Sequence, residues 1–284
     1  MALAADLEGA QSEPVNVAWA RDDVLLYAVA VGAGAEDPTA ELALTTENTE
    51  GVRTTALPSF AEIITRGARV DLGEIDPTRV VHAEQSFRLA GPLPLEGRAR
   101  VTSTVTEVLD KGSGALVRSA AEAVDAETGA PLLSTTRSVF LRGEGGFGGS
   151  RGKTVPSPVP DRAPDLEVTY RTSPGQALLY RLTGDRNPLH SDPAFAARGG
   201  FDRPILHGMC TYGVTARALV ATVCDGDATR LLGMDARFTA PVVPGQELTV
   251  AVWRTGGNGT AFRTTAGGPD GVVVLDHGTA VLAP

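Results

Sequence analysis

Residues 182–196, LTGDRNPLHSDPAFA, place an aspartate, an asparagine and a histidine around one proline. Pro188 fixes its own φ and biases Asn187 away from helical backbone, so we expect a rigid turn here. A rigid turn would hold Asp185 and His190 at a fixed separation. A carboxylate and an imidazole that share a water molecule can move protons to and from it, so the stretch predicts acid–base chemistry on water. The alternative is structural: Asp185 caps the turn and His190 packs beneath it.

The next segment, FDRPILHGMC at residues 201–210, adds a hydrogen-bond donor to this chemistry. Apolar residues recur at three- and four-residue spacing from about His207 to Cys224, which predicts a long helix. Gly208 would lie in its first turn, where backbone N–H groups have no carbonyl partner within the helix. Such an N–H, assisted by the helix dipole, can stabilise a developing oxyanion, and glycine lets a ligand approach closely. An acid–base pair beside an oxyanion donor suits enolate chemistry next to a carbonyl.

The elements that must position these groups follow one plan in both halves of the chain. Tyr27 in DVLLYAVAVG matches Tyr180 in QALLYRLTGD, and Phe87 in HAEQSFRLAGP matches Phe238 in MDARFTAPVV. Both pairs are about 150 residues apart and occur in the same order. In each half, helical segments precede alternating strands, which predicts an α+β fold with an antiparallel sheet against a central helix. The central helix of the first half, PSFAEIITR, has the weaker pattern.

A Gly- and Pro-rich stretch separates the two halves. We expect an N-terminal domain at residues 1–150, a linker at 151–164 and a C-terminal catalytic domain at 165–284. A literal G-x-G-x-x-G begins at Gly143, and a dinucleotide site would require it to open a helix. The following SRGKTVPSPVP cannot form a helix, so we reject a dinucleotide cofactor.

The composition narrows the function classes. The chain has 284 residues, a net charge of −9 and a pI of about 5.0, which argues against a nucleic-acid-binding protein. Cys210 and Cys224 show no metal-ligand spacing and are expected to be buried structural thiols. The N-terminal MALAADLEGA has no positively charged region of a secretory signal, and no apolar run approaches the ~18 residues of a membrane span. We therefore expect a cytoplasmic protein that binds neither nucleic acid nor membrane.

The residues of the turn and the helix start carry a family resemblance. YRLTGDRNPLHSDPAFA with GFDRPILHGMCTYG resembles the signature of hydratase 2, the MaoC-like (R)-specific enoyl-CoA hydratases. VVHAEQSFRLAGPLP, VLDKGSG and GEGGFGG resemble the hydratase region of peroxisomal multifunctional enzyme type 2, so the likeness spans nearly the whole chain. It implies a double hot-dog fold, with a long helix wrapped by an antiparallel β-sheet in each half. It also implies reversible hydration of trans-2-enoyl-CoA to (3R)-3-hydroxyacyl-CoA, without a metal or redox cofactor.

The resemblance also assigns roles position by position. Asp185 and His190 become the catalytic pair, Asn187 belongs to the same turn, and Gly208 is the oxyanion donor through its N–H. The residues that it places against the acyl-CoA substrate are His82, Ala83, Lys111, Arg186, Pro188, Leu189 and Phe238. Lys111 suits a CoA phosphate because an acidic protein needs local cations for that anion, although a solvated hairpin tip explains it equally well. The expected partners are acyl-CoA and, in a homodimer, a second copy of the chain.

The first half lacks the catalytic residues. Gly32 falls opposite Asp185, and no histidine occurs between Tyr27 and His82, so we expect one site per chain. We expect the first half to hold the acyl tail instead, with Ala61 on its path. The competing functions are dehydration of a 3-hydroxyacyl chain on acyl carrier protein, a catalytically silent acyl-CoA-binding protein and, less favoured, a hot-dog thioesterase.

Overall fold

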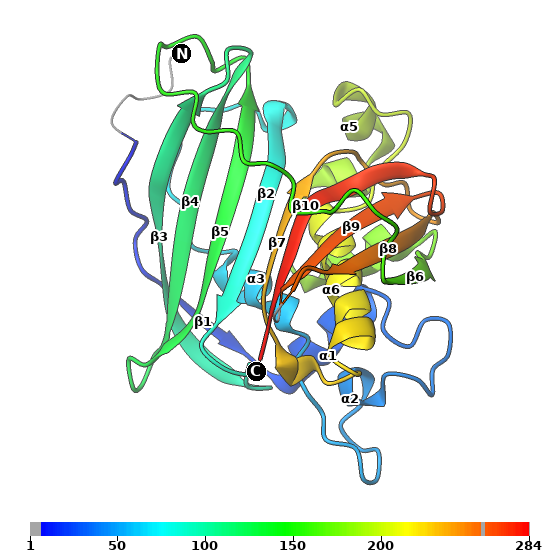
Figure 1. Cartoon of the computed structure of the whole chain (residues 1–284). Helices are drawn as coiled ribbons and strands as arrows, with labels where there is room; N and C mark the ends of the chain where they lie inside the picture. The colour runs from blue at the N-terminus through cyan, green and yellow to red at the C-terminus, as the bar shows by residue number, and fades with distance from the viewer. Residues whose placement is uncertain (1–6, 257–258, 284) are drawn as a thin grey trace.

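The structure, a computed structural model, describes residues 7–256 and 259–283, so the first six residues of the segment read for a targeting signal lie outside the description. Its strands form one ten-stranded antiparallel sheet (Figure 1). From edge to edge the order is β1-β3-β4-β5-β2-β7-β10-β9-β8-β6. The strands are β1 (Val15–Trp19), β2 (Val80–Leu89), β3 (Gly97–Asp110), β4 (Gly114–Asp125), β5 (Pro131–Arg142), β6 (Leu166–Arg171), β7 (Leu231–Phe238), β8 (Glu247–Arg254), β9 (Thr260–Ala266) and β10 (Val272–Leu282).

The two halves of the sheet have the same topology. Counted from its own edge, the first half runs 1-3-4-5-2 and the second runs 6-8-9-10-7. β2 and β7 pair at the centre, where Phe87 lies opposite Met234 and Glu84 opposite Arg237. The predicted repeat and the α+β double hot-dog class are therefore confirmed.

The helices lie on one side of the sheet and differ between the halves. They are α1 (Arg21–Ala30), α2 (Leu42–Thr45), α3 (Ala61–Thr65), α4 (Gln176–Tyr180), α5 (Pro193–Arg198) and α6 (Gly208–Val223). Short 3-10 turns lie at η1 (Pro58–Phe60), η2 (Pro77–Arg79), η3 (Arg181–Thr183), η4 (Pro188–His190) and η5 (Ala228–Arg230). The prediction of a long helix from His207 is confirmed by α6, whose residues are almost all buried (Figure 1).

The first half does not contain the long helix that the resemblance implied. Its central helix is the 3-10 turn η1 continued by α3, and Gly67 ends the helical backbone soon afterwards. Residues 67–76, GARVDLGEID, then follow an irregular path, because two glycines and three acidic residues give no apolar helical face. The shorter helix leaves space between this segment and the sheet.

Helix α6 packs closely against the first half. A Cβ on Gly213 would stand 2.5 Å from Val31 Cγ1 and 2.9 Å from the Tyr27 hydroxyl, so only glycine lets α1 and α6 approach this far. On its other side the Tyr212 hydroxyl donates to the carbonyl of Met234 on β7 at 2.7 Å. These contacts fix the start of α6 relative to both halves.

The glycine-rich segment after β5 does not open a helix. The carboxylate of Asp110 accepts hydrogen bonds from the N–H groups of Gly146 and Gly148, at 2.9 and 2.8 Å. The segment therefore binds a side chain of its own chain, in agreement with the rejection of a dinucleotide site. Downstream, Val155 and Pro158 line a hollow on the outer face of the sheet. The division into 1–150, 151–164 and 165–284 remains a prediction, although β5 and β6 lie on either side of the linker.

Two smaller expectations can be compared with the structure. Cys210 and Cys224 are both buried and free, as predicted. Within residues 7–256 and 259–283, every helix is too short or too polar to cross a membrane.

Candidate active site

The predicted turn is present between α4 and α5. Gly184 adopts a φ of 112°, which a side chain rarely tolerates, and reverses the chain after η3. The side-chain oxygen of Asn187 accepts from the N–H of Leu189 at 3.0 Å, and Asp185 Oδ1 accepts from the N–H of Asn187 at 3.2 Å. Asp192 then caps α5, because its side chain accepts from the N–H groups of Ala194 and Phe195. The turn is held by its own side chains, and Asp185 is at its centre.

His190 is oriented by a backbone carbonyl. Its Nδ1 lies 2.9 Å from the carbonyl oxygen of Ile205, so Nδ1–H donates and Nε2 carries the free lone pair. Burial lowers the pKa of His190 below the usual 6.5, although the Ile205 carbonyl and Asp185 both act in the opposite direction. His190 is therefore neutral near pH 7, with Nε2 able to accept a proton.

A second histidine, His207, lies directly against the first. The two rings stack with centroids 3.8 Å apart, and His207 Nε2–H donates to the backbone carbonyl of Asp185 at 3.3 Å. Burial and the neighbouring His190 lower the pKa of His207 to about 3. From the sequence, His207 was expected only to mark the start of the helix, and its position next to Gly208 was the available signal for a role in the site.

Asp185 is charged at neutral pH despite its burial. Burial by itself raises the pKa of the Asp185 carboxyl, and His207 and His190 oppose burial only where they are protonated. The N–H of Asn187 and the guanidinium of Arg66 act at neutral pH, and the pKa lies below its ordinary value. The turn thus combines an ionised carboxylate with a neutral imidazole.

Gly208 begins α6 beside this pair and faces an aromatic ring. A Cβ on Gly208 would stand 3.1 Å from Phe238 Cε1. The ring of Phe238 packs in turn on His82, with centroids 4.7 Å apart. Nε2 of His82 lies 3.1 Å from both the Glu84 carbonyl and Gln85 Oε1, and burial lowers the pKa of His82 to about 3. The structure therefore joins Gly208, Phe238 and His82, from three elements, into one wall.

The other predicted substrate contacts are distributed around this core. Ala83 lies at the irregularity in β2, where the pairing with β5 shifts between His82 and Glu84. Arg186 and Pro188 are exposed on the turn. Leu189 points towards the end of α5.

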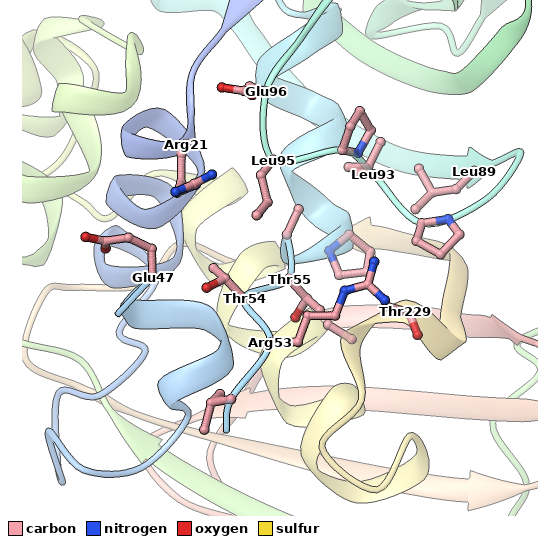
Figure 2. A pocket seen from close by; sticks show the side chains of 16 residues that line it. Arg21, Glu47, Arg53, Thr54, Thr55, Leu89, Leu93, Leu95, Glu96 and Thr229 are labelled. Carbon is pink, nitrogen blue, oxygen red and sulfur yellow. The ribbon is translucent and has the colours of Figure 1, made fainter. Parts of the chain in front are cut away.

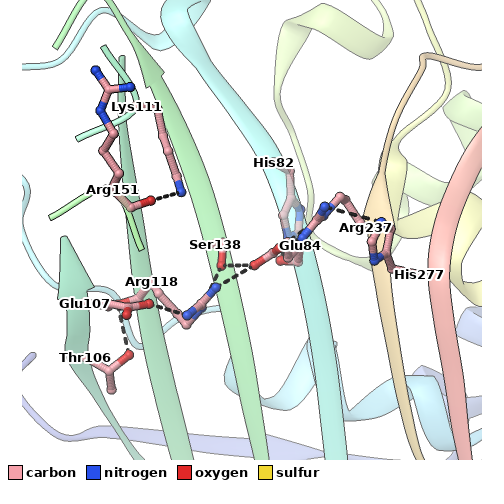
Figure 3. Close-up of polar contacts among 10 residues, drawn as sticks. All are labelled: His82, Glu84, Thr106, Glu107, Lys111, Arg118, Ser138, Arg151, Arg237 and His277. Carbon is pink, nitrogen blue, oxygen red and sulfur yellow. Dashed lines mark hydrogen bonds and ion pairs between the residues drawn. The ribbon is translucent and has the colours of Figure 1, made fainter. Parts of the chain in front are cut away.

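Lys111 is not brought to the turn by any contact within the described part of the chain. It lies at the tip between β3 and β4, and its amine donates to the backbone carbonyl of Arg151. In Figure 3, strands β4 and β5 lie between Lys111 and His82. His277 lies beside Arg237 in a half-buried polar network that continues through Glu84 (Figure 3).

The position opposite Asp185 in the first half is closed. A Cβ on Gly32 would stand 2.9 Å from Arg217 Nη1, and Gly32 has a φ of 88°. The guanidinium of Arg217 is buried there, donates to Glu41 at 2.7 Å and to the Val31 carbonyl at 3.1 Å, and stacks over Tyr170. An arginine thus fills the space that an acidic side chain would need.

Two cavities differ in their relation to the turn. One, of about 280 Å³, lies between residues 65–75 and the inner face of β3, β4 and β5, and we call it the inner groove. Arg66 and Arg137 line it, and the pKa values of both respond to the charge of Asp185. Ala61 does not line it and is fully buried in the core, so the expected tail path through Ala61 is wrong.

The larger cavity, of about 490 Å³, is shown in Figure 2. It is lined by Arg53, Leu93 and Thr229, and the last of these follows the C-terminal end of α6. The candidate pair lies at the N-terminal end of that helix, about 24 Å away for 16 residues of helix. No residue of the turn lines either cavity, but Arg66, which lines the inner groove, reaches the turn through the carbonyl of Thr183.

Comparison with known proteins identifies the family and the fold. Residues 156–270 match the MaoC like domain, and residues 18–143 match the MFE-2 hydratase 2 N-terminal domain. The chain is 45% identical to 3-hydroxyacyl-thioester dehydratase Y of Mycobacterium tuberculosis, with 98% of each chain covered. A crystal structure of a MaoC-like dehydratase from Phytophthora capsici superposes with a TM-score of 0.86 at 30% identity, covering 98% of this chain and 96% of that one. A Mycobacterium tuberculosis protein described as a double hotdog fold superposes with a TM-score of 0.61 at 17% identity, covering 97% and 96%, which supports the fold alone.

The fold and these relatives together define a hot-dog enzyme of the hydro-lyase class. The chain belongs to the MaoC-like hydratases of the hydratase 2 type.

Proposed function

We propose that the chain catalyses the reversible hydration of trans-2-enoyl-CoA to (3R)-3-hydroxyacyl-CoA, with Asp185 and His190 as its acid–base pair. The observation that carries the proposal is the arrangement of the pair. His190 is bound through Nδ1 to the Ile205 carbonyl, and both Asp185 and His190 contact His207, the residue directly before the first N–H of α6. Relatives named enoyl-CoA hydratase and 3-hydroxyacyl-thioester dehydratase support the same reaction.

Each residue acts through an atom that is not already occupied by a hydrogen bond within the turn. His190 Nε2 accepts a proton from water while the water oxygen bonds to C3 of the enoyl group. The negative charge of Asp185 stabilises the imidazolium that forms. The C2–C3 double bond becomes an enolate, whose thioester oxygen is stabilised by the N–H of Gly208. Return of the proton to C2 completes the addition and restores the pair.

We propose that the acyl tail enters the inner groove. Its lining near the sheet is apolar, with Val117, Val139 and Leu141, and its other end is bounded by Arg66 and Arg137 close to the turn. The short helix of the first half creates this space. The contact of the CoA phosphates with Lys111 is supported by the family resemblance alone, and Lys111 is exposed at the β3–β4 tip.

The direct test is a hydration assay on crotonyl- to hexadecenoyl-CoA with chiral analysis of the product. Asp185→Asn and His190→Ala should each lower kcat by about 100-fold or more. Asp270→Asn, in the exposed β9–β10 turn, and His277→Ala, on the last strand, are the matched controls. Turnover close to wild type in either variant of the pair would refute the assignment, and a (3S) product would refute the stereochemistry.

The tail assignment has its own test on neighbouring residues of β4. Ala121 lines the groove, whereas Ala120 points to the opposite face of the strand. Ala121→Phe should lower kcat/KM for decenoyl-CoA far more than for crotonyl-CoA, and Ala120→Phe should affect both alike. Equal losses on both substrates in Ala121→Phe would exclude the groove as the tail site.

We also propose a cytoplasmic location, supported by the two reduced cysteines in the core, and CoA rather than acyl carrier protein as the preferred carrier. Cell fractionation tests the first. Rates on matched CoA and carrier-protein thioesters test the second, and light scattering tests the homodimer.

A further inference from the structure

Arg66 belongs to the half that lacks the catalytic pair, yet its side chain ends at the catalytic turn. It follows α3 directly, and only 12% of its side chain is exposed. Its Nη1 donates to the backbone carbonyl of Thr183 at 3.2 Å, and its Nη2 donates to the hydroxyl of Tyr180 at 3.1 Å. Glu62, one helical turn earlier, lies 3.5 Å from Nε and balances the buried charge.

The two acceptors of Arg66 bound the turn from two sides. Thr183 is separated from Asp185 only by Gly184, and a Cβ on Gly184 would stand 3.5 Å from Arg66 Nη1. The ring of Tyr180 packs against His207 with centroids 4.9 Å apart, and His207 stacks on the ring of His190. One guanidinium therefore contacts both the backbone that leads to the carboxylate and the aromatic stack behind the imidazole.

The internal repeat supplies a second observation. Arg66 and Arg217 are 151 residues apart, as are the repeat partners Phe87 and Phe238. Arg217 also crosses to the other half and donates to a backbone carbonyl there, that of Val31. In the first half the guanidinium of Arg217 fills the space beside Gly32. In the catalytic half Arg66 reaches only as far as the carbonyl of Thr183, and the position after Gly184 is occupied by Asp185.

We propose that Arg66 is a positioning residue for the catalytic turn, through its hydrogen bonds to Thr183 and Tyr180. The non-catalytic half thus supplies one part of the active site besides space for the tail. Arg66 does not transfer a proton or contact the reacting atoms. It holds the turn so that the carboxylate and the imidazole face the same water. The kinetic part of the test rests on the proposed hydratase activity.

The test is Arg66→Ala, which removes both hydrogen bonds and opens space into the inner groove. Displacing a catalytic group by about 1 Å costs on the order of 100-fold in rate, so we expect kcat to fall by about 10- to 100-fold. With crotonyl-CoA as the substrate, KM should change by less than about 3-fold, because both hydrogen bonds of Arg66 are made within the protein and the short acyl group does not fill the inner groove. Added guanidinium at millimolar concentration should restore part of kcat, and equal concentrations of sodium chloride should not. Arg66→Lys, which keeps the charge, should be intermediate.

Hydrogen–deuterium exchange provides a readout that does not depend on turnover. Amides of residues 184–190 should exchange faster in Arg66→Ala, and those of the outer strands should not. Arg88→Ala is the matched control, because Arg88 also joins the two halves, through Asp235 at 2.6 Å, but on the outer face of the sheet. It should leave kcat and the exchange of the turn unchanged. If Arg66→Ala does not fold, Tyr180→Phe removes one of the two hydrogen bonds and should give a smaller loss of kcat with faster exchange of the turn.

The outcomes separate this inference from the proposed function. Wild-type kcat in Arg66→Ala, or a loss of kcat without guanidinium rescue and without faster exchange of residues 184–190, would overturn the positioning role. If Arg66→Ala does not fold, wild-type kcat and unchanged exchange of residues 184–190 in both Arg66→Lys and Tyr180→Phe would also overturn the positioning role. A wild-type chain that hydrates no enoyl thioester, but whose turn loosens in Arg66→Ala, would refute the hydratase assignment and support the positioning role.

Discussion

Replacing Gly208 by alanine should impair catalysis while leaving the proposed oxyanion donor in place. The new Cβ would stand 3.1 and 3.3 Å from two ring carbons of Phe238. Ordinary contacts between carbon atoms are about 3.5–4.0 Å, so the ring must move by about half an ångström. His82 limits that movement, because its ring packs on Phe238 and is itself held by two hydrogen bonds on β2.

The size of the effect follows from the strain. Overpacking a well-filled site by one methyl group costs about 1–3 kcal/mol. If the strain falls on the transition state, kcat/KM drops by about 5- to 150-fold. The measurement is the initial rate of crotonyl-CoA hydration. Gly91→Ala is the control, because a Cβ at that glycine would meet no atom within 4 Å.

A second substitution identifies the cause. Phe238→Leu shortens the side chain that the new methyl group meets, so Gly208→Ala combined with Phe238→Leu should be more active than the sum of the two single effects predicts. Wild-type kcat/KM in Gly208→Ala would show that the ring of Phe238 moves aside without cost. Additive losses in the double variant would show that the ring is not what the methyl group displaces. Either result would refute the reasoning.

Three further predictions concern stability and the carrier. Arg217→Met should lower the free energy of unfolding by about 3 kcal/mol, because the partly buried carboxylate of Glu41 loses its partner. For a chain of this length that is about 5 °C in Tm. The exposed pair lost in Arg88→Met should lower the free energy of unfolding by about 1 kcal/mol or less, so equal Tm shifts by calorimetry would contradict the prediction. Lys111→Ala should raise KM for enoyl-CoA with little change in kcat, and added salt should shrink the effect; an unchanged KM at low salt would return Lys111 to a purely structural contact with the linker. The free energy of unfolding should be highest above pH 6.5 and fall as the pH drops towards 3. His82 and His207 have folded-state pKa values of about 3 and therefore bind protons more readily when the chain is unfolded. A Tm that stays constant over this range would disprove the prediction.

Local patterns in the sequence predicted the elements that depend on local forces. Alternating polarity is typical of strands, and the segments ELTVAVWR, TAFRTTA and VVVLDHGTAVL are β8, β9 and β10 in the structure. Pro188 predicted a rigid turn because proline restricts the backbone wherever it occurs. The same reasoning found the start of α6 at Gly208.

Long-range contacts could not be predicted in this way. Arg66 meets Thr183 across 117 positions, and Arg217 meets Glu41 across 176. Nothing in the neighbourhood of an arginine shows which carbonyl it will reach after folding. The helix of the first half was predicted at its observed place, PSFAEIITR, but its length was not. The family resemblance implied a long helix, whereas Gly67 and the irregular segment after it ended the helix early.

The pairing of β2 with β7 has an evolutionary consequence. Two separate copies of one small domain, joined along such a seam, would be related by symmetry, and every substitution would appear twice. Covalent linkage of the copies removes that constraint, so each can accumulate changes that the other does not share. One copy could lose its acidic residue at position 32 and shorten its helix while the other kept both features. After such a fusion one copy can do without a catalytic pair, and its surface that faces the pair of the other copy is free to change.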